Sequence, residues 1–217
     1  MQDDTRERIL EAAEALFAEH GFSRTSLRAI TARAGVNLAA VNYHFGSKHA
    51  LIQAIFTRRL EPINQERLAR LEALRRQGRA DLEAILEAFI APTLKSEKDH
   101  HPGEVRFMRL LGRTHAGAAD ALRDFVHGLY AEVLAAFEQA LVEALPELPR
   151  LELHWRLHFL MGVVSFTMAG TDTMRLFTDC HLPEAGDREA LLRRLIPFLA
   201  AGLRAPLAPT ERRPSLP

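Results

Sequence analysis

The 217-residue chain lacks the features that mark secreted and membrane proteins. Its single cysteine, Cys180, cannot form a disulfide within the chain, which suits a reducing cytoplasm. No apolar run approaches the roughly 20 residues that a membrane-spanning helix needs. Residues Met1–Asp4 are partly acidic and contain no apolar stretch, so we expect no secretory signal. The sequence therefore predicts a cytoplasmic protein that does not interact with a membrane.

Acidic residues are absent from one long stretch, His20–Leu60, although the chain carries 28 acidic and 28 basic residues in all. These 41 residues hold six of the basic residues, which leaves 22 basic against 28 acidic residues elsewhere. The six are Arg24, Arg28, Arg33, Lys48, Arg58 and Arg59. Carboxylates repel phosphates, so a surface that contacts nucleic acid excludes them. The stretch therefore predicts a DNA-binding surface, with an ordinary solvated basic face as the alternative.

Apolar residues recur at helical spacing in nearly every segment, and no segment shows the alternation of a strand. Glycine and proline separate the segments, and Pro62 is expected to kink or break the helix that contains it. The predicted helices are Arg6–Glu19, two short helices between residues 25 and 45, a helix that starts at Lys48, and Ile63–Gln77, Asp81–Lys95, Glu104–Arg113, Ala118–Leu145, Leu151–Thr173 and Arg188–Arg204. This pattern predicts an all-α fold.

Residues 25–45 have the pattern of a helix-turn-helix. Thr25 or Ser26 can cap the first of the two helices, and Asn37 can cap the second. Gly35 stands in the turn, where the backbone needs a left-handed conformation. Inward-facing apolar residues on both helices would fix their angle, so that the second helix projects outward to enter a major groove.

The outward side of the second helix carries residue types that can contact base edges. Asn42 can bind adenine through two hydrogen bonds, and Ala39 can contact a thymine methyl group. Phosphates would be held at the N-terminus of the first helix and by Lys48, which follows the helix cap Ser47. The predicted DNA contacts are Thr25, Ser26, Arg28, Asn37, Leu38, Ala39, Asn42, Tyr43, His44 and Lys48.

The run I-x3-A-G-V-N-x3-V-x-Y-H-F-x2-K-x2-L, from Ile30 to Leu51, resembles the DNA-binding signature of TetR-family bacterial transcriptional regulators. The resemblance implies an all-α homodimer whose N-terminal three-helix domain binds a palindromic operator in double-stranded DNA. It also implies a C-terminal helical bundle that binds a small effector and then releases the operator. We therefore predict a DNA-binding domain in residues 1–50, a ligand-binding and dimerisation domain in residues 51–205, and a disordered proline-rich tail in residues 206–217. Such a regulator, most simply a repressor, would be associated with the nucleoid.

Three stretches of the sequence resemble the PsrA-like, fatty-acid-responsive group within that family. They are Val36–Gln53 and Leu153–Gly170, together with Phe107–Gly112. The resemblance implies a long-chain fatty acid or acyl-CoA as effector, and the apolar residues of the bundle suggest where it would bind. The predicted effector contacts are Phe107, Met108, Arg109, Leu111, Phe125, Leu129, Phe159 and Met161. A regulator of the same fold that senses an unrelated apolar or aromatic compound, or a non-specific architectural DNA-binding protein, is the alternative.

The sequence gives little support for an enzyme. His154 and His158 are spaced to chelate zinc, but no acidic residue lies between them as in a metalloprotease helix. There is no glycine-rich phosphate loop and no nucleophile motif around Cys180. We therefore expect no catalytic residue, no metal and no cofactor. The segments Leu151–Thr173 and Arg188–Arg204 are apolar on several sides and are the predicted two-fold interface.

Overall fold

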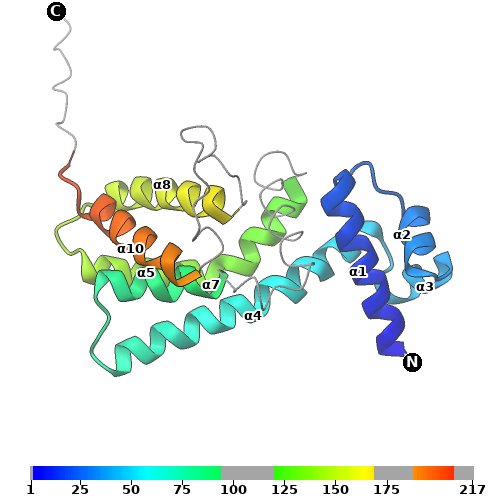
Figure 1. Ribbon diagram of the computed structural model, residues 1–217, viewed down its shortest axis with the longest axis horizontal. Helices are drawn as coiled ribbons and strands as arrows, with labels where there is room; N and C mark the ends of the chain where they lie inside the picture. Colours follow the sequence, from blue (N-terminus) through cyan, green and yellow to red (C-terminus); the bar gives the residue numbers. More distant parts are fainter. Residues whose placement is uncertain (1, 94–119, 169–187, 208–217) are drawn as a thin grey trace, which may run out of the picture.

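The computed structural model describes residues 2–93, 120–168 and 188–207, and these residues form helices and loops with no strand (Figure 1). The all-α prediction is therefore confirmed. In chain order the helices are α1 (Gln2–His20), α2 (Leu27–Ala34), α3 (Leu38–Phe45), α4 (Lys48–Arg76), α5 (Leu82–Ile90), the short 3-10 helix η1 (Ala91–Thr93), α7 (Asp120–Ala144), α8 (Arg150–Met168) and α10 (Arg188–Arg204). The predicted helix Glu104–Arg113 lies outside the described residues, and so does the predicted tail beyond Leu207.

Helices α1, α2 and α3 pack together against the first part of α4 and form the unit at one end of the molecule (Figure 1). Their common core contains Phe17 of α1, Ile30 of α2, Val41 of α3 and Phe56 of α4, all without exposed surface. Burying each of these large side chains stabilises the unit by about 1.5–3 kcal/mol. The first turns of α7 also reach this core.

A second core joins the end of α4 to α5, α7, α8 and α10. Leu71 of α4, Phe137 of α7 and Leu199 of α10 are buried in it. Helix α4 thus contributes to both cores, and the change from one to the other falls between Leu60 and Leu71. The domain boundary that the sequence analysis predicts after residue 50 lies near the start of α4, and both cores contain residues of this helix.

Polar caps set the helix starts in the N-terminal unit. The side chains of Ser26, Asn37 and Ser47 each accept a hydrogen bond from the backbone amide three residues later, at 3.1, 2.9 and 3.0 Å. Gly35 has φ +64° after the last residue of α2, and a Cβ there would also meet the Arg8 guanidinium. These four residues confirm the caps and the turn predicted from the sequence.

Helix α4 continues through Pro62 without ending, so the alternative of a helix break is wrong. Proline removes one amide donor from the helix ladder, yet Leu60 and Asn64 on either side of it are both buried. Packing of these neighbours in the protein interior maintains the helix, while Pro62 itself faces solvent. One continuous helix therefore connects the N-terminal unit to the second core.

The buried guanidinium of Arg156 connects α8 to the end of α10. Its Nη1 donates to the carbonyl oxygens of Leu203 and Ala205, both at 2.7 Å, and its Nε donates to Glu152 at 2.9 Å. The last carbonyls of a helix have no partner within the helix and carry partial negative charge. Arg156 satisfies them and so fixes α10 against α8.

We predict that Arg156→Met lowers the free energy of unfolding by about 2–4 kcal/mol, because the buried carbonyls of α10 lose a charged donor. Chemical denaturation followed by circular dichroism measures this change. The control is Arg193→Met, since Arg193 is exposed on α10 and its ion pair with Glu189 is a surface pair. Equal stability of the two variants would contradict this role for Arg156.

Candidate functional site

Helix α3 presents a row of side chains to solvent on the side opposite the core. Tyr43 is 76% exposed and Leu38 is 44% exposed, and Ala39 and Asn42 are exposed beside them. Val41, on the other side of α3, is fully buried. The structure thus brings the predicted base-contacting residues together on one outer surface.

The first turn of α2 lies next to this surface and contains no acidic residue. Ser26 and Arg28 are exposed there, as expected for phosphate contacts. The prediction for Thr25 needs correction, because Thr25 is 3% exposed and its hydroxyl donates to the carbonyls of Leu16 and Gly21. Its side chain closes the turn between α1 and α2 and is not available to a phosphate.

Lys48 stands at the N-terminus of α4, close to the turn that precedes α2. Its Nζ lies 4.4 Å from the centre of the Phe22 ring, within the range of a cation–π interaction. Partial burial lowers the pKa of Lys48 below its usual value. The Phe22 ring, in the turn between α1 and α2, therefore holds the ammonium group close to the segment that leads into α2.

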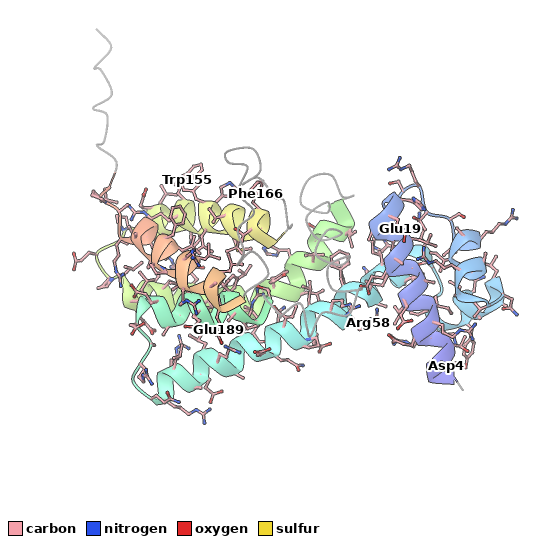
Figure 2. All side chains as sticks on the ribbon, viewed as in Figure 1. Asp4, Glu19, Arg58, Trp155, Phe166 and Glu189 are labelled. Carbon is pink, nitrogen blue, oxygen red and sulfur yellow. The ribbon has the colours of Figure 1, made fainter. Side chains whose placement is uncertain are left out.

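Half of the basic residues in the acid-free stretch are paired with carboxylates of α1, which the sequence did not indicate. Glu14, only 2% exposed, accepts from Arg58 Nη2 at 2.6 Å and from Arg59 Nη2 at 2.9 Å. Arg58, which Figure 2 labels on α4, also pairs with Glu7 of α1.

Arg33 of α2 pairs in the same way with Glu19 of α1, at 3.0 Å. The expectation that all six cations serve one DNA-facing surface is therefore corrected. The candidate interface keeps Arg24, Arg28 and Lys48, while the paired arginines attach α2 and α4 to α1.

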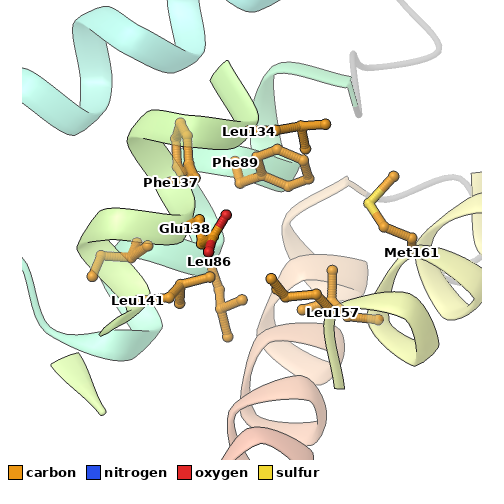
Figure 3. Close-up of a pocket in the computed structure, with 10 residues that line it drawn as sticks. Leu86, Phe89, Leu134, Phe137, Glu138, Leu141, Leu157 and Met161 are labelled. Atoms are coloured by element: carbon orange, nitrogen blue, oxygen red, sulfur yellow. The ribbon is translucent and has the colours of Figure 1, made fainter. Parts of the chain in front are cut away.

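A pocket lies between α5, α7 and α8 in the second core (Figure 3). It encloses about 420 Å³ of space, part of which is continuous with solvent. Nine of its ten described lining residues are apolar, which is typical of small-molecule sites. The lining residues are Ile85, Leu86, Phe89, Leu134, Phe137, Glu138, Leu141, Leu157, Leu160 and Met161.

The pocket contains only one of the described residues that the sequence analysis assigned to the effector, Met161. Phe159 is 60% exposed on the outer side of α8, and Phe125 and Leu129 pack against the N-terminal core. These three therefore do not line this pocket, because α8 is apolar on most sides and α7 reaches both cores, and their assignment to the effector stays a prediction. The other predicted contacts, Phe107, Met108, Arg109 and Leu111, lie outside the described residues. The amphipathic pattern of Leu82–Ile90 is the sequence feature that could have predicted this wall of the pocket.

Among the residues that the structure describes, Glu138 is the one polar side chain that lines the pocket. Its Oε1 accepts from His154 Nε2 at 3.0 Å and from Arg150 at 3.1 Å, both on α8. Hydrogen bonding from His154, with a further bond from Arg150, lowers the pKa of the Glu138 carboxyl. Glu138 is therefore a carboxylate at neutral pH.

A buried arginine lies directly behind the pocket wall. Arg67 of α4 stacks on the Phe89 ring at 4.2 Å, and its Nε donates to the Phe89 carbonyl at 2.8 Å. Its Nη1 donates to Asn64, which in turn donates to the Leu129 carbonyl at 2.8 Å. Burial lowers the pKa of Arg67, and the Tyr130 ring lies 5.6 Å from its guanidinium. Phe89 thus lines the pocket and also holds Arg67 of α4 through its ring and its carbonyl oxygen.

The outer side of α8 carries exposed aromatic residues. Trp155, Phe159 and Phe166 are 53–60% exposed, and Phe198 of α10 is 65% exposed. Figure 2 shows Trp155 and Phe166 on the side of α8 that faces away from the second core. Aromatic residues grouped in this way on a protein surface are typical of a protein interface.

Within the described residues, no group of three or more histidine, cysteine or carboxylate side chains could hold a metal ion. None of the helices in that part of the chain is both long enough and apolar enough to cross a bilayer. His154 is paired with Glu138, and the ring of His158 lies edge-on to the ring of Trp155.

Family comparisons agree with this arrangement. The family described as bacterial regulatory proteins, tetR family, matches residues 9–55, which include α2 and α3. The family described as tetracyclin repressor-like, C-terminal domain, matches residues 87–202, more than half of the chain. The chain belongs to the TetR family of bacterial transcriptional regulators. TetR-family proteins are DNA-binding regulators and not enzymes, as the sequence analysis predicted, while the narrower resemblance to the PsrA-like group stays a prediction.

Curated relatives match only part of this TetR-family chain. The transcriptional regulator SrpR of Pseudomonas putida is 33% identical over 93 residues, which is 43% of either chain. UidR of Escherichia coli K12 is 47% identical over 51 residues, which is 24% of this chain and 26% of UidR. The chain therefore spans less than half the length of these two relatives.

Solved structures of TetR-family proteins match nearly the whole chain. The regulator FadR of Bacillus halodurans has a TM-score of 0.67 at 18% identity and covers 93% of this chain and 97% of its own, which shows the fold alone. SmeT, the repressor of a multidrug efflux pump of Stenotrophomonas maltophilia, has been solved with triclosan. That complex has a TM-score of 0.64 at 25% identity and covers 98% of this chain and 99% of its own.

Proposed function

We propose that this TetR-family regulator is a homodimeric repressor that binds a palindromic operator in double-stranded DNA and leaves it when a small apolar effector binds. The observation that carries the proposal is the outer surface of α2 and α3. It combines exposed Asn42 and Tyr43 with the amide end of α2 and the ammonium group of Lys48, and contains no acidic residue. Base contacts from α3 and phosphate contacts from its surroundings are the two components of specific binding. A repressor of this kind acts in the cytoplasm, at the nucleoid.

The proposed dimer forms through α8 and α10 of two copies. Their exposed aromatic residues lie on the side opposite the effector pocket, so a second copy would cover them and leave the pocket in place. Two α8–α10 pairs related by a two-fold axis make a four-helix interface. Such a dimer presents two copies of α3 to successive major grooves, which explains the expectation of a palindromic operator.

The apolar lining of the pocket supports an apolar effector. A long-chain fatty acid or acyl-CoA is the candidate that the sequence resemblance suggests. A second candidate, an uncharged apolar or aromatic compound, is favoured because none of the described residues that line the pocket is basic. SmeT, solved with the aromatic compound triclosan, is a precedent of the same fold.

We infer that the effector acts on DNA binding through Phe89 and α4. An occupant of the pocket contacts one side of Phe89, and the Phe89 ring and carbonyl hold Arg67 of α4. Because α4 is continuous to Lys48, a shift of α4 at Arg67 changes the position of the N-terminal unit and the spacing of the two α3 helices. An effector can shift this equilibrium only by its differential affinity for the two states, commonly about 1–3 kcal/mol.

For the DNA interface, we predict that Lys48→Ala weakens binding to the operator and to unrelated duplexes alike, because a phosphate contact is lost. The slope of log K against log salt should fall by about one. Asn42→Ala should instead relax preference at one base pair by about 1–3 kcal/mol. Fluorescence anisotropy with operator variants, over a range of salt concentrations, measures both effects.

The control for Lys48→Ala is Arg75→Ala at the far end of α4, which should leave DNA binding unchanged. If Lys48→Ala and Arg75→Ala gave the same salt slope, the proposed phosphate contact would be absent. If Asn42→Ala bound every operator variant as the wild-type protein does, Asn42 would not read a base.

For the dimer, we predict that Trp155→Glu raises the dissociation constant of the dimer at least about thirtyfold, because it places an unpaired charge in the interface. Sedimentation equilibrium measures this constant. Ala69→Glu adds the same charge on an exposed position of α4 and should leave the dimer intact. A Trp155→Glu protein as dimeric as Ala69→Glu would show that α8 is not the interface.

For the coupling, we predict that Arg67→Met retains effector binding within about threefold but raises the effector concentration needed for operator release at least about fivefold. Direct binding and release of labelled operator are measured on the same protein sample. Arg70→Met, which removes only a surface pair with Glu66, should behave as the wild-type protein. Undiminished release by Arg67→Met would show that the signal does not pass through Arg67.

A further inference from the structure

Helix α3, which carries the proposed base contacts, is anchored in the core at one point. All eight of its residues are described, and Val41 is the one buried residue among them. Ala40, His44 and Phe45 are half-buried, and the remaining four residues of α3 are exposed. A short helix that is anchored at one residue can rotate about it, so its direction depends on contacts at its two ends. That direction decides where Asn42 meets the bases.

Arg8 of α1 holds the turn that leads into α3. Its Nη2 donates to the carbonyl oxygen of Ala34 at 2.5 Å and to that of Gly35 at 3.1 Å. Carbonyls at a helix end lack partners within the helix and carry partial negative charge, so a guanidinium suits this place. A Cβ on Gly35 would lie 2.9 Å from the same Nη2 atom. Gly35 therefore leaves room for the arginine as well as adopting the left-handed turn.

A second arginine of α1 lies at the other end of α3. The Arg6 guanidinium carbon is 5.6 Å from the centre of the Phe45 ring, within the range of a cation–π interaction. Phe45 is the last residue of α3 and packs against the N-terminal core. Helix α1, which lies beside α2 and α3 in Figure 1, thus contacts the chain both before α3 and at its last residue.

We propose that Arg8, with Arg6 in a smaller part, is a positioning residue for operator recognition, which fixes the direction of α3 and does not itself contact DNA. The proposal rests on the proposed function, in which α3 contacts the bases of the operator. Arg8 is exposed, so water can bind both carbonyls when its side chain is removed, and the N-terminal unit keeps its fold. Water does not link α1 to the turn, however. Helix α3 then samples directions that do not fit the groove, and the apparent affinity falls with the fraction that does fit.

The test compares two duplexes of equal length, one selected by the wild-type protein from a randomised pool and one of scrambled sequence. Arg8→Met should lower affinity for the selected duplex at least about tenfold, which is about threefold for each copy in the dimer. Affinity for the scrambled duplex should change by less than about twofold, with the same salt slope, because no phosphate contact is lost. Fluorescence anisotropy over a range of salt concentrations measures these quantities, and circular dichroism checks that the variant is folded.

Two results would overturn the proposal. A loss of affinity for both duplexes, with a salt slope lower by about one, would show that Arg8 binds a phosphate. Unchanged affinity of a folded Arg8→Met protein for the selected duplex would show that Arg8 does not position α3.

Arg33→Met is the matched control, because it also removes a cation from the end of α2. The Arg33 guanidinium pairs with Glu19 at the surface, so this variant should keep the wild-type preference for the selected duplex. A loss as large as that of Arg8→Met would assign the effect to charge near α2 and not to the contact that Arg8 makes.

Two conservative variants test the hydrogen bonds themselves. Arg8→Lys keeps a charged donor with nearly the same reach and should retain the preference within about threefold of the wild-type value. Arg8→Gln has a shorter, neutral donor and should lower the preference at least about threefold, which provides the test if Arg8→Met does not fold. The full wild-type preference in Arg8→Gln would then overturn the proposal.

The role of Arg8 and the proposed function fail in different ways. If the wild-type protein selects a duplex and a folded Arg8→Met protein prefers it equally, the proposed function stands and the role of Arg8 is wrong. If the wild-type protein prefers no duplex in the pool, both proposals are wrong.

Discussion

The ion-pair cluster between α1 and α4 is the contact on which the arrangement of this protein depends. Glu14 is buried and accepts from two consecutive arginines of α4, Arg58 and Arg59. A buried carboxylate is costly unless it is paired, and removal of one partner from such a pair typically costs about 3–5 kcal/mol. The cluster therefore fixes α1, and with it α2 and α3, to the first part of α4. Any displacement of α4 must also displace the surface that faces DNA.

Helix α4 contributes to both cores, as α7 does. Its first part is buried with the N-terminal unit, and beyond Pro62 it carries Arg67, which is held by the ring and carbonyl of Phe89. Phe89 also packs edge-on against Phe137, with ring centres 5.1 Å apart, and both line the pocket. In the function that we propose, a ligand in the pocket and DNA at α3 would each favour a different position of α4. No other rigid element is needed for the coupling that we propose.

The sequence predicted the local structure well, because local chemistry determines it. Side-chain caps such as Ser26 and Asn37 act within three residues, and α10 has the predicted bounds Arg188–Arg204. The predicted outer surface of α3 is exposed for the same reason, since helical periodicity decides which residues face the core.

Interactions between distant segments could not be predicted in this way. A charge count does not reveal that Arg58 pairs with residues 44 and 51 positions away. Likewise, α8 is apolar on most sides, so its sequence could not decide that Met161 lines the pocket while Phe159 faces solvent. Continuity of α4 through Pro62 also depends on neighbours in both cores, which outweigh the local preference of proline.

The distance between the two N-terminal units in the dimer tests the central claim most directly. Spin labels at Ser23→Cys, in a Cys180→Ser background, place one label on each copy at an exposed turn before α2. Pulsed electron paramagnetic resonance should give one narrow distance distribution with operator bound. With a compound that releases the operator, the distribution should move away from that distance. Release of the operator with an unchanged distribution would contradict the account.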